Sequence, residues 1–102
     1  MARWKKPNKE EISAGRAILR ERAAAGELIF PAAVAEIRRS FGLTQAQFAS
    51  ITGITKRQVL EIETGKANPT VETLERIAGL FGFTLGFVPK VNSASTVAPK
   101  LQ

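Results

Sequence analysis

The sequence predicts an all-α fold with a short strand at its C-terminal end, and three observations support this. Apolar residues recur at three- and four-residue spacing through most of the chain, as they do in amphipathic helices. Ser, Thr or Asn precedes several of these segments and Gly follows them, as caps do. Between residues 83 and 88, large apolar residues instead alternate with small ones, which is typical of a strand.

The length of 102 residues fits one domain with extensions. We expect a basic arm and a helical extension over residues 1–30 and a compact helical domain over residues 31–82. A strand over residues 83–89 and a flexible tail over 90–102 complete the expected organisation.

The composition favours an anionic partner and disfavours catalysis. Fifteen Lys and Arg against nine acidic residues give a net charge of +6, which suits nucleic acid, an acidic protein face or a membrane surface. The chain has no Cys and no His, so it lacks the usual nucleophilic thiol, general base and zinc ligands. We therefore expect no enzyme activity, no cofactor and no metal. No apolar run approaches the roughly 20 residues that span a bilayer, and no secretory leader pattern follows Met1, so we expect a cytoplasmic, nucleoid-associated protein without a membrane partner.

The helical extension should begin at Asn8, because Glu11 stands three residues later and completes a capping box. A helix over residues 9–25 follows, with only Ile12, Leu19 and Ala23 on its apolar face. This narrow stripe predicts weak packing, or packing against another subunit. The group formed by Ile12, Ile18 and Leu19 is interpreted as core or dimer surface, with a toxin-binding site as the alternative. In the arm, Arg3, Lys5 and Lys6 form either a solvated tail or a contact to DNA, and Trp4 is expected to pack on protein.

Four further helices are expected over residues 31–41, 45–52, 55–64 and 70–81. Thr44, Thr55 and Thr70 are their expected N-caps, and Gln47 completes a capping box with Thr44. Gly residues end most of these helices. The residues expected to face inward are Val34, Ile37 and Phe41, then Phe48 and Ile51, then Val59 and Ile62, and finally Val71, Leu74, Ile77, Ala78 and Phe81.

The second and third of these four helices are joined by a tight turn. Gly53 tolerates the positive φ that such a turn needs, and Ala49 is small where two steeply crossed helices touch. The helix after the turn buries one stripe, which leaves Lys56, Arg57 and Glu61 on its opposite face. Polar residues in the first turn of such a helix can reach base edges in the major groove. The segment from Thr44 to Thr64 therefore predicts a helix-turn-helix that binds double-stranded DNA.

These spaced positions together resemble the XRE family of phage-repressor and Cro-like helix-turn-helix domains. The resemblance rests on LTQAQFA at 43–49, GIT at 53–55, Val59, IETGK at 62–66 and NPT at 68–70. It covers about residues 32–83 and implies a five-helix, lambda-repressor-like domain that binds operators as a homodimer, on DNA with an inverted repeat.

The resemblance also implies roles for individual residues. Arg38 and Glu63 match a structural pair that ties the helix over 31–41 to the recognition helix. Gln45 would contact phosphate or brace the recognition helix, although its place also suits plain capping. Glu61 is a departure, since an acid could accept from a cytosine amino group, orient Arg57 or weaken non-specific binding. The expected base contacts are Lys56, Arg57 and Glu61, and the expected phosphate contacts are Gln45, Thr55, Gln58, Lys66 and Asn68.

The expected strand adds a second resemblance, to HipB-type antitoxins, in which a short strand pairs across the dimer. Self-pairing of residues 83–88 would satisfy backbone groups that a lone strand leaves open. A local hairpin with residues 28–30 is the alternative. The resemblance implies an autoregulating antitoxin with a toxin protein as partner, while a stand-alone or prophage regulator and a protein-interaction module are the other hypotheses. The expected dimerisation residues are Leu80, Phe83, Leu85 and Phe87.

Overall fold

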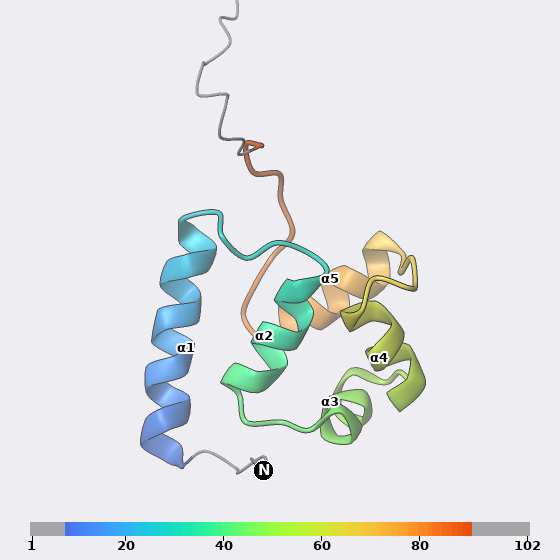
Figure 1. Ribbon diagram of the computed structural model, residues 1–102, viewed down its shortest axis with the longest axis horizontal. Coiled ribbons are helices and arrows are strands. Elements are labelled where there is room, and N and C mark those ends of the chain that lie inside the picture. Colours follow the sequence, from blue (N-terminus) through green and yellow to red (C-terminus); the bar gives the residue numbers. More distant parts are fainter. Residues whose placement is uncertain (1–7, 91–102) are drawn as a thin grey trace, which may run out of the picture.

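The computed structural model describes residues 8–90 and holds five α-helices in this range, with no strand among them. They are α1 (Lys9–Ala24), α2 (Ala32–Ser40), α3 (Gln45–Thr52), α4 (Lys56–Glu63) and α5 (Val71–Leu80) (Figure 1). The predicted all-α, five-helix fold is confirmed. One of the five helices is the N-terminal extension, so residues 31–82 themselves contribute four. No helix between residues 8 and 90 is long and apolar enough to cross a membrane.

Four of the five described helices, α1, α3, α4 and α5, begin at an N-cap side chain that accepts a hydrogen bond from a backbone amide that the helix leaves unpaired. Thr44 accepts a hydrogen bond from the amide of Gln47 at 3.0 Å, and the Gln47 side chain accepts one from the amide of Thr44 at 2.8 Å. The same reciprocal arrangement joins Asn8 to Glu11 at the start of α1. At α5, the Thr70 hydroxyl accepts from the amide of Thr73 at 3.0 Å.

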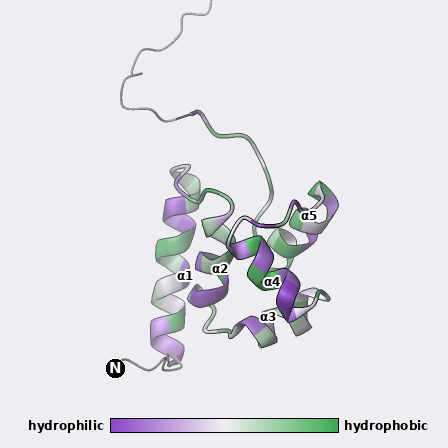
Figure 2. Ribbon diagram, turned by 45° about the vertical axis from the view of Figure 1, so that its right-hand side comes forward, coloured by the Kyte–Doolittle hydropathy of each residue, from purple (hydrophilic) through white to green (hydrophobic). Residues whose placement is uncertain are grey.

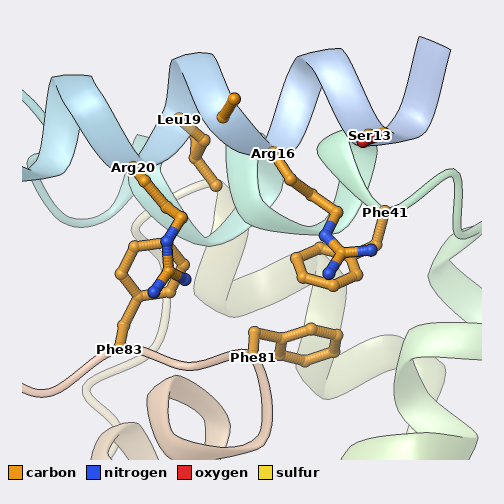
Figure 3. A pocket seen from close by; sticks show the side chains of 8 residues that line it. Ser13, Arg16, Leu19, Arg20, Phe41, Phe81 and Phe83 are labelled. Atoms are coloured by element: carbon orange, nitrogen blue, oxygen red, sulfur yellow. The ribbon is translucent and has the colours of Figure 1, made fainter. Parts of the chain in front are cut away.

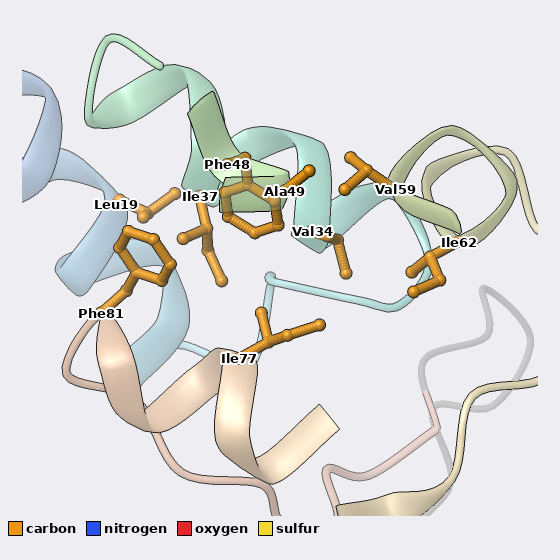
Figure 4. Close-up of a cluster of buried hydrophobic side chains, with 9 residues drawn as sticks. All are labelled: Leu19, Val34, Ile37, Phe48, Ala49, Val59, Ile62, Ile77 and Phe81. Atoms are coloured by element: carbon orange, nitrogen blue, oxygen red, sulfur yellow. The ribbon is translucent and has the colours of Figure 1, made fainter. Parts of the chain in front are cut away.

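The core lies between α2, α3, α4 and α5, with one contribution from α1 (Figure 4). Phe48 of α3 is completely buried, and its ring stacks on Phe81 with centroids 5.3 Å apart. Phe41 meets the same Phe81 ring edge-on at 4.8 Å. These three packed rings join the ends of α2 and α5 to the centre of the domain. The buried cluster consists of Leu19, Val34, Ile37, Phe48, Ala49, Val59, Ile62, Ile77 and Phe81.

Two residues expected in this core are exposed. Ile51 is 49% exposed, because α3 buries Phe48, Ala49 and Thr52 and thereby turns Ile51 outward. Val71 is 63% exposed, since it occupies the first turn of α5, beyond the edge of the core that Ile77 and Ala78 help to form. The predictions for Ile51 and Val71 were therefore wrong.

Helix α1 lies alongside α2, the helix with which it makes most of its contacts (Figure 1). Leu19 is the buried residue of α1, as its narrow apolar stripe predicts, whereas Ile18 is 58% exposed. An ion pair adds to the attachment, with Arg22 Nη1 2.7 Å from Glu36 Oε1 of α2. Hydrogen bonding and charge from Glu36 raise the pKa of Arg22, so the Arg22 guanidinium stays positively charged.

After α5, residues 83–90 run past the connection between α1 and α2 (Figure 1). Val88 lies close to Gly26, since a Cβ built on that glycine would be 3.7 Å from the Val88 side chain. No backbone hydrogen bond joins residues 28–30 to 83–88, so the alternative local hairpin is not formed. Pairing of this segment across a dimer stays a prediction. The expected basic arm with Arg3, Trp4, Lys5 and Lys6, and the tail from residue 91, lie outside the described residues.

Gly53 offers a clean test of the turn between α3 and α4. Its φ is +82°, in the left-handed region, and a Cβ added there would meet nothing within 4 Å. We therefore expect Gly53→Ala to destabilise the domain by about 1–2 kcal/mol through backbone strain alone. Gly79 lies inside α5 with equally open space, so Gly79→Ala should stabilise the domain by up to about 1 kcal/mol. Urea unfolding of both variants measures these changes in the free energy of unfolding. A change of the same sign and size in the two variants would contradict the prediction.

Candidate nucleic-acid interface

The segment α3–turn–α4 is built as a compact unit. The amides of Gly53 and Ile54 both donate to the carbonyl oxygen of Ala49, at 2.9 and 3.2 Å, which closes α3 and reverses the chain. Ala49 is 6% exposed, and its small side chain allows the two helices to approach. Because the turn is hydrogen-bonded and Ala49 is packed, α4 has a fixed orientation on the domain.

Helix α4 divides into an inner and an outer side. Val59 and Ile62 are buried in the core, as predicted. The side chains of the first turn are exposed instead, and Figure 2 shows hydrophilic residues on α4 beside its hydrophobic ones. A helix held by one apolar stripe can offer the opposite side to a groove. The exposed residues of this side are Lys56, Arg57, Gln58 and Leu60.

Arg57 and Glu61 form a pair on this outer side. Arg57 Nε donates to Glu61 Oε2 at 3.1 Å, one helical turn apart, while the arginine side chain is 85% exposed. Only Nε of the guanidinium makes this contact, so both terminal nitrogens remain available to a further acceptor. Of the three interpretations of Glu61, this geometry corresponds to the one in which the acid orients Arg57.

The N-terminus of α4 has a capping box that the sequence reasoning missed. The Thr55 hydroxyl accepts from the Gln58 amide at 3.0 Å, and Gln58 Oε1 accepts from the Thr55 amide at 2.8 Å. The signal was present, because Gln three residues after Thr is the usual pattern. The cap occupies the backbone amides of Thr55 and Gln58, whereas those of Lys56 and Arg57 make no hydrogen bond within residues 8–90. Phosphate could therefore meet these two free amides and the Gln58 Nε2 atom.

A largely buried ionic network joins α2, α3 and α4. Arg38 Nε donates to Glu63 Oε2 at 2.7 Å, and Arg38 Nη2 donates to Glu63 Oε1 at 3.2 Å. The side chains of Arg38 and Glu63 are only 10% and 6% exposed. The remaining nitrogen, Nη1, donates to the carbonyl oxygen of Leu43 at 2.9 Å, in the loop before α3. The two residues expected to pair are thus in bidentate contact, which is the strong geometry for Arg and a carboxylate.

Gln45 is a third member of this network. Its Nε2 donates to Glu63 Oε1 at 3.1 Å, so the side chain at the start of α3 is anchored to the end of α4. This geometry corresponds to the bracing role and not to plain capping, which Thr44 performs. A phosphate contact from Gln45 would have to come from its free backbone amide or from the second Nε2 hydrogen.

The loop after α4 contributes two exposed polar residues. The amide of Lys66 donates to the carbonyl oxygen of Glu61 at 2.8 Å, which fixes the backbone at the end of the helix. The Lys66 side chain makes no ion pair within the described residues. Asn68 is exposed in the same loop. Lys56, Arg57 and Lys66 thus give this region three positive charges, against one from Glu61.

The expected dimerisation residues lie away from α4 and differ in exposure. Leu80, Leu85 and Phe87 are 51%, 40% and 105% exposed. Phe83, in contrast, packs against the core of its own domain. Three of the four expected dimerisation residues, Leu80, Leu85 and Phe87, are thus exposed to a partner.

Comparison with known proteins places this arrangement in a family. A family model described as helix-turn-helix matches residues 34–88, just over half of the chain. An uncharacterised HTH-type transcriptional regulator of Haemophilus influenzae is 35% identical over 52 residues, covering 51% of this chain and 53% of that protein. The HTH-type transcriptional regulators PuuR of Escherichia coli and Shigella flexneri are each 33% identical over 52 residues, covering 51% of this chain and 28% of their own. The chain thus spans between about a quarter and a half of these relatives, and no solved structure matches it significantly. The matched segment contains the whole of α3, the turn and α4, and the chain belongs to the XRE family of helix-turn-helix proteins.

Proposed function

We propose that the chain is a dimeric, sequence-specific DNA-binding repressor that inserts α4 into the major groove. The observation that carries this proposal is the exposed first turn of α4, with Lys56 and Arg57, on a helix whose other end is held by the Arg38–Glu63 pair. A rigid support matters because base reading depends on placing a few donors accurately. The relatives named as HTH-type transcriptional regulators support the same class of function.

Arg57 is the main base-reading residue in this proposal. Its two terminal nitrogens are free, and arginine most often reads guanine through O6 and N7. Glu61 restricts where the guanidinium points, which reduces the entropy lost when it meets a base. Lys56, on the same exposed turn, supplies a further donor to a base or to an adjacent phosphate.

The DNA backbone contacts come from both ends of α4. The free amides of Lys56 and Arg57 face outward at the positive end of the helix, where phosphate binds well. The exposed Lys66 and Asn68 extend the contact beyond the other end. These contacts hold the domain on any duplex and confer no sequence preference.

Dimerisation is supported by exposed apolar surface far from α4. Leu85, Phe87 and Val88 line one apolar groove with Ile29 and Phe30, and all five are at least 40% exposed. Large side chains gathered in this way usually mark a protein interface. A second copy covering this groove would place two α4 helices on one duplex, which calls for an inverted repeat.

An antitoxin role is the second candidate, favoured by Phe87, which no part of the described chain covers. A toxin protein would then bind outside α4, on α1 or on the apolar groove, while α4 binds the promoter of the same operon. A toxin gene adjoining this one would support the antitoxin role, and an isolated gene would favour a stand-alone regulator.

Selection from a pool of randomised DNA duplexes tests the proposed function. We expect the full chain to enrich an inverted repeat whose half-sites lie about 10 base pairs apart, or ~34 Å along the helix. Two chains should be bound per enriched duplex. Recovery of unrelated sequences after repeated rounds would contradict sequence-specific binding and favour a protein-interaction module that has kept the fold.

A further inference from the structure

A second site lies between α1 and the ends of α2 and α5, and it shares only Phe83 with the apolar groove. It is a half-open cavity of about 460 Å³, a size that small ligands commonly occupy (Figure 3). It exists because α1 presents small and polar residues toward the core here, where apolar anchors would have closed the gap. The side chains that give it its character are Ser13, Arg16, Arg20, Phe41, Phe81 and Phe83.

The two arginines of this cavity have no acidic partner. All nine acidic residues of the protein fall within the described part of the chain, and none forms an ion pair with Arg16 or Arg20. By contrast, Arg22, Arg38 and Arg57 each contact a glutamate. Arg16 and Arg20 are one helical turn apart on α1, so both guanidinium groups can reach one anion.

The aromatic residues define the rest of the site. The Arg16 guanidinium carbon lies 4.9 Å from the centroid of the Phe41 ring. Arg20 Nη1 lies beside Gly82, 3.4 Å from where a Cβ would stand, next to Phe83 in the chain. In Figure 3 both arginines extend from α1 toward the phenylalanines. The cavity thus combines two positive charges with the faces and edges of three rings.

We propose that this cavity binds a small aromatic carboxylate. The carboxylate accepts hydrogen bonds from Arg16 and Arg20, which suit its planar, two-oxygen geometry. The aromatic ring of the ligand packs in offset or edge-on contact with Phe41, Phe81 and Phe83. Because three rings line the cavity beside two guanidinium groups without an acidic partner, a ligand with both an aromatic ring and a carboxylate fits it better than an inorganic anion or a neutral arene.

Such a ligand would bridge α1 and the helical domain. Phe41 and Phe81 belong to the packed rings of the helical domain, whereas Arg16 and Arg20 belong to α1, whose buried residue is Leu19. Binding should therefore stabilise the docking of α1 and raise the melting temperature of the whole chain, since the ligand binds only the folded state.

Titration of the full-length protein with 2-naphthoate, without DNA, tests this site by calorimetry and amide NMR. We expect saturable 1:1 binding, with shifts at residues 13–20 and 81–83. Arg16→Gln and Arg20→Gln should each weaken binding about tenfold, as the loss of one charge-assisted contact does. Arg76→Gln, which removes the same charge from α5 outside the cavity, should change it less than twofold.

Three results would overturn the proposal. The first is an absence of saturable binding at millimolar naphthoate. The second is an equal loss of affinity in the Arg76 variant, which would show that the arginines act only through the net charge of the protein. The third is equal affinity for the neutral 2-naphthylmethanol or for inorganic phosphate. Equal affinity for the alcohol would show that the cavity needs no carboxylate, and equal affinity for phosphate would show that it is a simple anion site. Failure here leaves the DNA-binding proposal intact, because no DNA is present.

Discussion

Replacing Glu63 with alanine should lower the free energy of unfolding by about 3–5 kcal/mol. The Arg38 guanidinium would lose both of its carboxylate contacts while its side chain stays only 10% exposed. Gln45 would lose its anchor to α4 at the same time. An unpaired buried charge costs far more than an exposed one, because water cannot replace the lost partner. Urea unfolding followed by circular dichroism measures the loss.

Two further variants test whether the loss of stability in Glu63→Ala comes from the buried, unpaired charge of Arg38. Removing both charges with Arg38→Met and Glu63→Leu should restore most of the lost stability, because apolar residues of similar volume fill the same space. Glu27→Ala removes an acid whose side chain is 61% exposed and should change stability by less than about 1 kcal/mol. A double variant as unstable as the single one, or a loss below about 1 kcal/mol for Glu63→Ala, would contradict the account.

Arg57→Ala should weaken binding to the selected DNA site by about 1–3 kcal/mol, or roughly five- to 150-fold. The side chain is 85% exposed, so the fold should be unaffected and the loss should come from the interface. Discrimination should also relax at the base pair that Arg57 reads. Fluorescence anisotropy with the selected duplex and its single-base variants measures both effects.

Lys66→Ala provides the matched comparison. Because Lys66 is expected to meet phosphate, its loss should weaken binding to selected and scrambled duplexes alike and reduce the salt dependence by about one unit of slope. If Arg57→Ala behaves in the same way as Lys66→Ala, Arg57 contacts only the backbone. If neither changes affinity, α4 is not the DNA-binding helix.

Local signals were sufficient to predict most of the helices. Asn8, Thr44 and Thr70 begin α1, α3 and α5 as expected, because capping depends on residues three positions apart in the chain. Gly53 was likewise predictable, since few other residues adopt a φ of +82° without strain.

Burial on short helices was harder to predict. Helix α3 has eight residues, little more than two turns, so several apolar stripes fit its sequence equally well. Ile51 and Thr52 compete for the inward position, and Thr52 takes it, with its buried hydroxyl satisfied by donating to the Phe48 carbonyl oxygen at 2.7 Å. Val71 faces outward because the core ends before the first turn of α5, which depends on tertiary packing that no local pattern contains.

The candidate site was predictable in its exposed residues and less so in its connections. Lys56 and Arg57 follow from the periodicity of α4, since Val59 and Ile62 fix the inner side. That Gln45 joins the Arg38–Glu63 pair depends on how α3 crosses α4, over 18 residues of separation. The cavity beneath α1 was visible in the sequence only as missing apolar anchors around Arg16, because its aromatic residues, Phe41, Phe81 and Phe83, lie far from Arg16 in the chain.

The central claim is that α4 reads a specific DNA sequence. Its most direct test is a competition measurement of the wild-type chain between the selected duplex and a scrambled duplex of the same composition, at near-physiological salt. The account predicts that the selected duplex binds at least about a thousandfold more tightly, as specific sites do. Equal affinity for the two duplexes would show that the chain binds DNA only through charge, and would contradict base reading by α4.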